Sequence, residues 1–158
     1  MLSEGDAAPD VKLQNMDGEE ISLGDYRGQK LVLYFYPKDD TSGCTKEAQD
    51  FTALAPEYEK AGAWILGVSK DDAKKHRKFT DKYELKIPLA TDTDGSACEA
   101  FGTWVEKSMY GRKYMGIDRA TFLIDGDGVV QRIWRKVKVP GHAEEVLAAV
   151  RDLKTRGS

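Results

Sequence analysis

The sequence predicts an α/β fold in which helices flank a mixed central sheet and a β-hairpin precedes that sheet. Apolar runs typical of buried strands, at residues 31–36 and 63–68, are separated by a long helical pattern, and two later strand-like runs are joined by a tight turn. A strand, a helix and a strand in succession favour parallel pairing, whereas a tight turn favours antiparallel pairing. We expect the 158 residues to form a single domain, residues 1–158.

The first elements follow from local patterns. Val11 and Leu13 alternate with polar residues, residues 16–18 supply a turn, and residues 20–23 return as the second strand of an N-terminal hairpin. Leu31 to Tyr36 then reads as a buried central strand because it is apolar, β-branched and aromatic throughout.

A helical pattern begins at Cys44, with Thr41 or Ser42 as its N-cap and Gly62 near its end. One face of that helix is apolar, at Ala48, Phe51, Ala55 and Tyr58. The later predictions are a strand at Ala63–Val68, a charged helix from Asp71 or Asp72 to Tyr83, a short strand at Ile87–Ala90, a short helix at Ser96–Phe101, a basic loop at Lys107–Gly116, two strands at Ala120–Ile124 and Val129–Trp134, and a last helix at His142–Leu153. We expect His76, on the charged helix, and His142, at a helix start, to be solvated or to cap helices.

Composition limits the classes of function. Apolar residues make up 41% and charged residues 32%, as in soluble globular proteins, and a net charge of −3 disfavours nucleic acid or anionic membrane as a partner. Cys44 and Cys98 are too few for a disulfide scaffold, and their spacing fits no zinc pattern, so we expect no metal. The first residues lack the basic start and apolar core of a secretory signal, and no run is long enough to span a membrane. These observations favour a cytoplasmic protein.

The segment from Tyr34 to Glu47 contains the main candidate for a reactive residue, Cys44. It places Cys44 in the first turn of a helix that follows a central strand, where unpaired N–H groups and the helix dipole favour an anion such as a thiolate. A free thiol, with a pKa of about 8.5, is only a few per cent ionised at neutral pH, whereas a helix N-terminus and a nearby cation can bring a thiol pKa to about 3.5–7.5. The alternative is a buried structural cysteine. The polar residues around Cys44 favour the reactive site.

The spacing Pro37-x-x-x-Thr41-x-x-Cys44, followed by Glu47, resembles the active-site signature of the peroxiredoxins. The flanking residues 34–40 and the later segment 116–125 are similar to the bacterioferritin-comigratory, or PrxQ, branch. The similarity extends from about residue 5 to about residue 153. It implies a thioredoxin-like fold with an N-terminal extension and a thiol peroxidase that needs no cofactor.

The resemblance also implies roles for individual residues. It matches Arg119 to the family's active-site arginine, although position alone would favour an exposed arginine at a strand start. Arg119 would then stabilise the thiolate and hold a peroxide oxygen, and Glu47 would brace its guanidinium. A first-turn glutamate that complements the helix dipole is the simpler interpretation of Glu47, and the two roles are compatible.

Three further positions belong to the expected site. The Thr41 hydroxyl and the backbone N–H groups of Gly43 and Cys44 would donate hydrogen bonds to the peroxide, and Pro37 would shelter the thiolate from water. The expected reaction reduces hydrogen peroxide and organic hydroperoxides through a sulfenic acid at Cys44. We expect a monomer that thioredoxin, glutaredoxin or a small thiol reduces.

Two alternatives remain open from the sequence. A thioredoxin-like disulfide oxidoreductase would need Cys-x-x-Cys, but Thr41 and Glu47 stand three residues on either side of Cys44. A thioredoxin-fold binding protein that has kept one cysteine is the non-enzymatic alternative.

The sequence also bears on how the sulfenic acid is reduced. The two positions at which relatives carry a resolving cysteine hold Gln49 and Thr80 in this chain. Only Cys98 remains, and its apolar helical neighbours indicate a buried structural thiol. We therefore predict a one-cysteine mechanism, with Cys98 as a resolving cysteine only if local unfolding brings it to Cys44.

Overall fold

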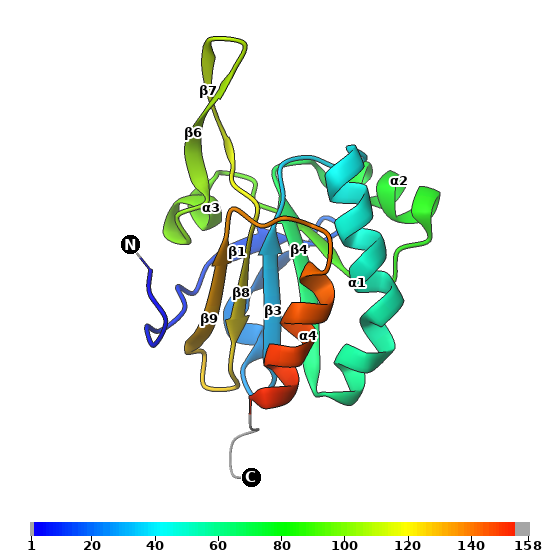
Figure 1. Cartoon of the computed structure of the whole chain (residues 1–158), viewed down its shortest axis with the longest axis vertical. Helices are drawn as coiled ribbons and strands as arrows, with labels where there is room; N and C mark the ends of the chain where they lie inside the picture. The colour runs from blue at the N-terminus through cyan, green and yellow to red at the C-terminus, as the bar shows by residue number, and fades with distance from the viewer. Residues whose placement is uncertain (1, 154–158) are drawn as a thin grey trace.

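The structure is a computed structural model in which residues 2–153 are described. Its centre is a seven-stranded sheet of order β2-β1-β5-β4-β3-β8-β9 (Figure 1). The strands are β1 (Lys12–Gln14), β2 (Glu20–Ser22), β3 (Lys30–Phe35), β4 (Ala63–Ser69), β5 (Leu89–Thr91), β8 (Ala120–Ile124) and β9 (Val130–Arg135). A separate two-stranded ribbon contains β6 (Trp104–Met109) and β7 (Arg112–Ile117).

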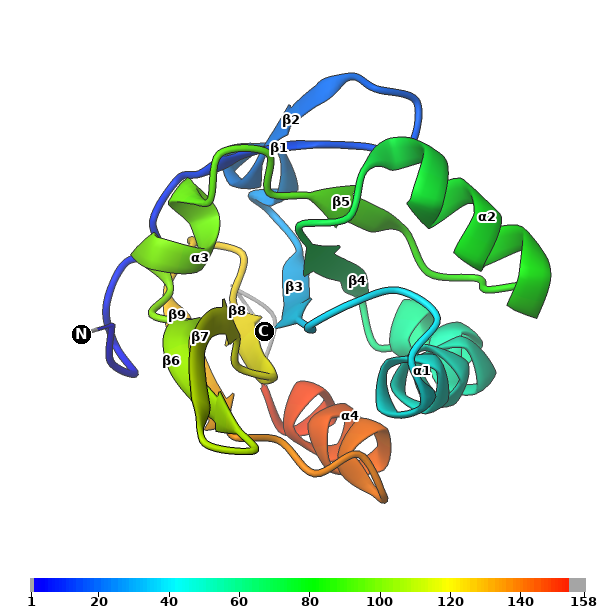
Figure 2. The ribbon, with the colours of Figure 1, turned by 90° about the horizontal axis from the view of Figure 1, so that it is seen from above.

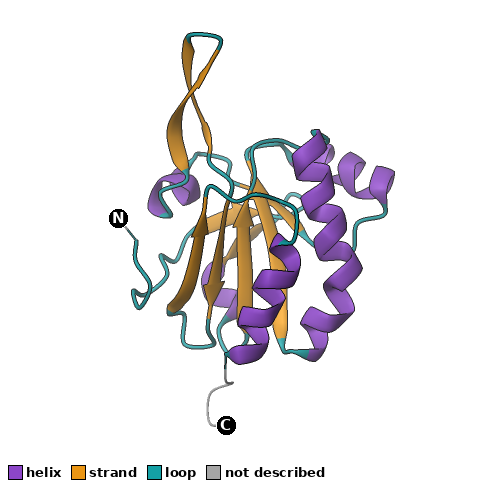
Figure 3. Cartoon of the chain, in the orientation of Figure 1, coloured by secondary structure: helices purple, strands orange, loops and turns teal. Residues whose placement is uncertain are grey.

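Within residues 2–153, four α-helices accompany the strands (Figure 3). They are α1 (Ser42–Lys60), α2 (Ala73–Tyr83), α3 (Ser96–Ala100) and α4 (His142–Asp152), and a short 3₁₀ helix covers Leu23–Tyr26. The predicted N-terminal hairpin is confirmed as β1 and β2, with paired residues such as Leu13 and Ile21.

The sheet is mixed, as the sequence predicts. Strand β3 pairs in parallel with β4 and antiparallel with β8, and all six of its residues are buried. Parallel strands that are covered on both faces read as continuous apolar runs, which is why this strand was clear in the sequence.

The two faces of the sheet hold separate cores. Val32, Tyr34 and Tyr36 pack with residues of α1, α2 and α4, whereas Leu33 and Phe35 pack on the opposite face with residues of α3. Successive side chains of a strand point to opposite faces, so alternate residues of one strand supply both cores. Figure 2 shows α1 and α4 together on one side of the sheet and α3 on the other.

Gly67 of β4 gives the aromatic core its space. A Cβ atom at this position would lie 2.7 Å from the ring of Tyr34, closer than carbon atoms can approach. Tyr34 stacks on Phe51 of α1 with ring centroids 4.8 Å apart. The glycine therefore lets this aromatic stack lie against the sheet.

The basic loop predicted at residues 107–116 is wrong, because the structure forms the β6–β7 ribbon there. Its strands pair in register from Trp104 and Ile117 to Met109 and Arg112. Most of its side chains are exposed on both faces, so the ribbon lacks the alternation of apolar and polar residues that identifies a half-buried strand.

Within residues 2–153, no helix is both long enough and apolar enough to cross a membrane.

Candidate active site

Cys44 lies where the sequence placed it, in the first turn of α1. The helix begins at Ser42, directly after the loop of residues 36–41 that follows β3. The Cys44 side chain is only 2% exposed and contacts the core beneath α1. The thiol therefore combines burial with the positive end of a 19-residue helix.

Arg119 contacts Cys44 although the two residues are 75 positions apart in the sequence. It lies between β7 and β8, and its Nη2 donates a hydrogen bond to the Sγ of Cys44 over 3.3 Å. Its Nη1 is 2.6 Å from Oε1 of Glu47. The guanidinium thus bridges the thiol and the carboxylate, and all three groups belong to one cluster.

Glu47 is more buried than a first-turn glutamate usually is. Its side chain is 1% exposed, and its Oε2 has no hydrogen-bond partner among the described residues. Burial raises the pKa of Glu47 from 4.5 to about 7, although the charge and hydrogen bond of Arg119 act in the opposite direction. The carboxyl holds Arg119 in place at the cost of its own desolvation.

Gly43 makes room for this contact. A Cβ atom at residue 43 would lie 3.1 Å from Nη2 of Arg119, which is tighter than an ordinary contact. The absence of a side chain lets the guanidinium approach the first turn of the helix, where it meets Cys44.

Thr41 and Pro37 lie in the loop that leads into α1, and both are exposed. Thr41 occupies the N-cap position, as predicted, but its side chain makes no capping hydrogen bond. Its hydroxyl instead donates to the carbonyl oxygen of Lys38 over 2.9 Å, which closes the loop on itself.

A buried network that was not predicted from the sequence lies behind this loop. His76 of α2 is 0% exposed, so the prediction that it is solvated or capping is wrong. Its Nδ1 lies 2.7 Å from Oδ2 of Asp39, and its Nε2 lies 3.0 Å from the carbonyl oxygen of Ala90. The Asp39 backbone N–H donates to Asp71, and the Tyr36 hydroxyl donates to the Asp39 carboxylate.

This network ties the loop before Cys44 to α2 and β5. The sequence does carry a signal for it, because His76 lies three residues before Phe79 and seven before Tyr83, on the inner face of α2.

His142 is also buried, against expectation, with its Nε2 2.8 Å from the hydroxyl of Thr121, and burial lowers its pKa.

Cys98 is not brought to this site. It is 0% exposed in α3 and belongs to the core on the face of the sheet opposite to the one that holds Cys44. Burial raises the pKa of the Cys98 thiol to about 12, with Asp92 acting in the same direction. Both cysteines are free thiols.

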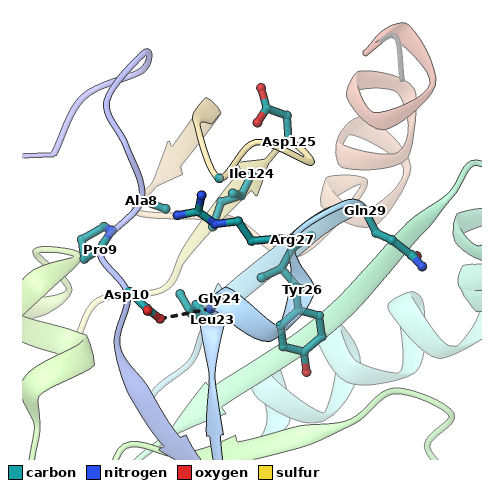
Figure 4. A pocket seen from close by; sticks show the side chains of 12 residues that line it. Ala8, Pro9, Asp10, Leu23, Gly24, Tyr26, Arg27, Gln29, Ile124 and Asp125 are labelled. Atoms are coloured by element: carbon teal, nitrogen blue, oxygen red, sulfur yellow. Dashed lines mark hydrogen bonds between the residues drawn. The ribbon is translucent and has the colours of Figure 1, made fainter. Parts of the chain in front are cut away.

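A hollow at the other end of the sheet holds none of these residues. Leu31, at the start of β3, and Ile124, at the end of β8, contribute to it, whereas Cys44 follows the end of β3. Figure 4 shows the Arg27 side chain lying across the hollow and Asp10 bonded to the backbone N–H of Gly24, at 3.0 Å. The carboxylates of Asp10 and Asp125, which line it, accept hydrogen bonds from nearby backbone N–H groups, so we assign the chemistry to the Cys44 cluster.

No group of three or more His, Cys, Asp or Glu side chains that could hold a metal ion occurs in the part of the chain that the structure describes.

The chain is similar to known proteins along most of its length. The model of the AhpC/TSA family matches residues 4–133. A putative peroxiredoxin bcp of Coxiella burnetii is 50% identical over 146 residues, which cover 92% of this chain and 97% of the relative.

Solved structures give the same result. Peroxiredoxin Q of Xanthomonas campestris is 49% identical, with a TM-score of 0.85 over 90% of each chain. A bacterioferritin comigratory protein of the same species, studied for its alkyl peroxide reduction, is 46% identical, with a TM-score of 0.86 over 93% of this chain and 98% of the other.

Proposed function

Because this chain belongs to the AhpC/TSA family and is a peroxiredoxin, a thiol-dependent peroxidase, we propose that Cys44 is the residue that peroxide oxidises. The observation that carries the assignment is the hydrogen bond from Arg119 to the Cys44 sulfur, 3.3 Å long, at the start of α1. A guanidinium and a helix N-terminus both favour the thiolate, which is the nucleophile.

The reaction follows from the chemistry of the thiolate. The Cys44 sulfur attacks one peroxide oxygen, and the weak oxygen–oxygen bond breaks as the sulfur–oxygen bond forms. The second oxygen leaves with a proton as water or an alcohol, and Cys44 becomes a sulfenic acid. Charge that develops on both oxygens needs donors that are already in place, and Arg119 already donates to the sulfur that the peroxide must approach.

The loop supplies the remaining proposed contacts. Contrary to the expectation that the Thr41 hydroxyl donates to the peroxide, its proton is engaged by the carbonyl of Lys38, so the Thr41 oxygen is better placed to accept the proton of a bound peroxide. The backbone N–H groups of Gly43 and Cys44 would donate to the peroxide oxygens. Pro37 would limit the access of water to the sulfur.

We propose both hydrogen peroxide and organic hydroperoxides as substrates. The alkyl peroxide reduction studied in the Xanthomonas relative supports the second class. No cysteine stands at position 41 or 47, which disfavours the dithiol oxidoreductase, and membership of a peroxidase family disfavours a binding protein without enzymatic activity.

We propose that a separate thiol molecule, and not a second cysteine of this chain, reduces the sulfenic acid. The two cysteines lie on opposite faces of the sheet, so Cys98 could reach Cys44 only after local unfolding. Thioredoxin, glutaredoxin or a small thiol would attack the sulfenic acid, release water and form a mixed disulfide. We propose that the enzyme acts as a monomer in the cytoplasm, where free thiols persist.

The test is peroxide consumption in the presence of dithiothreitol. Cys44→Ser should abolish turnover while its circular dichroism and thermal transition remain native-like, because a serine hydroxyl stays protonated and attacks poorly. Cys98→Ser is the matched control and should keep most of its turnover. Residual activity of Cys44→Ser above about a tenth of wild type would mean that another residue is the nucleophile.

A further inference from the structure

The β6–β7 ribbon exposes an unusual share of the apolar surface. Among the described residues, five large hydrophobic side chains are exposed, and only Trp64 lies outside this ribbon and its turn. The other four are Met109, Tyr110, Tyr114 and Met115. Exposed apolar groups gathered on one projecting element indicate an interaction surface rather than part of a core.

The two faces of the ribbon differ in charge. Residues that are paired directly across antiparallel strands share a face, so Lys107 and Tyr114 lie together with Met109 and Arg112. Within the described chain, neither Lys107 nor Arg112 has a carboxylate within ion-pairing distance. We call the face that carries Lys107, Met109, Arg112 and Tyr114 the cationic face. The opposite face carries Lys113, which is 3.7 Å from Glu106.

The cationic face also carries apolar groups. A Cβ atom at Gly116 would lie 3.4 Å from both the aliphatic stem of Lys107 and the ring of Tyr114. The Lys107 stem and the Tyr114 ring therefore lie beside the glycine and form a small apolar patch, and Arg112 belongs to the same face of the ribbon. An apolar patch on a face with unpaired cations complements an acidic surface that has an apolar centre.

Tyr110, at the tip, does not serve the fold. Tyr110 and Gly111 both have a positive φ, of 52° and 78°, as the central residues of a type I′ turn require. Asparagine or glycine favours this conformation, whereas an aromatic residue is strained in it. The Tyr110 side chain is also 99% exposed, so no contact within the described chain offsets that strain. An aromatic residue held in this way is typical of a binding surface.

The ribbon stands beside the candidate active site. Arg119, which contacts Cys44, follows the end of β7 by two residues. Figure 1 shows the ribbon projecting beyond the end of the sheet at which α1 begins. A protein that delivers a thiol to Cys44 would therefore meet the ribbon.

We propose that the cationic face and Tyr110 form the docking surface for the protein that reduces Cys44, a thioredoxin-type dithiol protein with an acidic, apolar-centred surface near its reactive cysteine. This inference rests on the proposed function, and it adds the partner's chemistry and its place of contact. We expect the complex to be transient, with the charges of the cationic face governing its rate of association.

The test compares a protein reductant with a small one. The double variant Lys107→Glu/Arg112→Glu should lower kcat/KM for thioredoxin, regenerated by its reductase and NADPH, by about tenfold or more. Oxidation by hydrogen peroxide and turnover with dithiothreitol should stay within about twofold, because neither residue contacts the reacting atoms. Raising the salt concentration should slow the wild type with thioredoxin and affect the variant less.

Two controls separate docking from general effects. Lys74→Glu/Lys78→Glu makes the same change in net charge on the exposed face of α2, away from the ribbon, and should leave thioredoxin turnover unchanged. Tyr110→Asn should raise the thermal midpoint by relieving the turn and should weaken turnover with thioredoxin. A change that only stabilises the fold would not produce that loss.

Three results would overturn the proposal. The first is equal thioredoxin kinetics for wild type and the ribbon variant. The second is a wild type that thioredoxin reduces no faster than dithiothreitol does. The third is light scattering that shows a dimer which Tyr110→Asn dissolves, since the ribbon would then be a self-interface. Loss of dithiothreitol turnover in Cys98→Ser would instead contradict the proposed one-cysteine function and leave the thioredoxin comparison intact.

Discussion

Burial of Glu47 predicts that protein stability falls as the pH rises through neutrality. The carboxyl is 1% exposed, and burial raises its pKa from 4.5 to about 7 despite the hydrogen bond from Arg119. The folded protein therefore binds a proton at this site more tightly than the unfolded chain does. The resulting stabilisation is fully present below pH 4.5 and is lost as the pH rises through about 7.

The size of the effect follows from the same values. A rise from 4.5 to about 7, at about 1.36 kcal/mol for each pH unit, corresponds to a loss on the order of 3 kcal/mol. Most of this loss falls between about pH 5 and about pH 8, where urea denaturation can be followed readily. A change of this size is a large fraction of the stability of a typical domain.

The assay compares wild type with Glu47→Gln. The amide keeps the shape of the side chain and an acceptor for Arg119, but it cannot titrate. The unfolding free energy of the variant, minus that of wild type, should rise by about 2–3 kcal/mol from about pH 5 to about pH 8. Groups that titrate in both proteins cancel in this difference.

The control is Glu57→Gln on the same helix. Glu57 also pairs with an arginine, Arg151, at 3.2 Å, but both side chains are about half exposed. Because an exposed ion pair contributes at most about 1 kcal/mol, the difference between this variant and wild type should vary by less than that over the same pH range. A flat curve for Glu47→Gln would contradict the expected effect of burial, and a falling one would mean that Arg119 outweighs burial.

Two further predictions concern the arginine and the loop. Arg119→Ala removes the donor 3.3 Å from the Cys44 sulfur, so it should slow oxidation by peroxide about 10²–10³-fold and move iodoacetamide alkylation of Cys44 to higher pH. An unchanged alkylation profile would show that Arg119 does not act on the sulfur. Asp39→Ala leaves the buried Tyr36 hydroxyl and the Nδ1 of His76 without their acceptor, and urea denaturation should show a loss of about 2–6 kcal/mol, at about 1–3 kcal/mol for each unsatisfied buried group. A loss below about 1 kcal/mol, the scale of an exposed pair, would contradict a buried network.

Much of the fold could be predicted because the signals are local. The apolar run of β3, the turn before β9 and the helical pattern after Cys44 can each be read from one short segment of the chain. The same locality places Cys44 in the first turn of α1, where the structure has it. Its contact with Arg119 joins residues 75 apart, and only the family resemblance indicated it in advance.

The rest depended on contacts between distant segments. His76 appeared solvated because its neighbours on α2 are charged, whereas its partner Asp39 lies 37 residues away. The β6–β7 ribbon was missed because neither of its faces is buried. That Cys44 and Cys98 lie on opposite faces depends on the path of the chain around the sheet, which periodicity within one element cannot reveal.

We propose that peroxide oxidises Cys44 and that no cysteine of the same chain resolves the product. The test is mass spectrometry after one equivalent of hydrogen peroxide, with the sulfenic acid trapped by dimedone and the peptides mapped. We predict one adduct, on the peptide that contains Cys44, with the Cys98 thiol still reduced in a native monomer. A disulfide-linked Cys44–Cys98 peptide, with the intact protein lighter by two hydrogen atoms, would contradict the account.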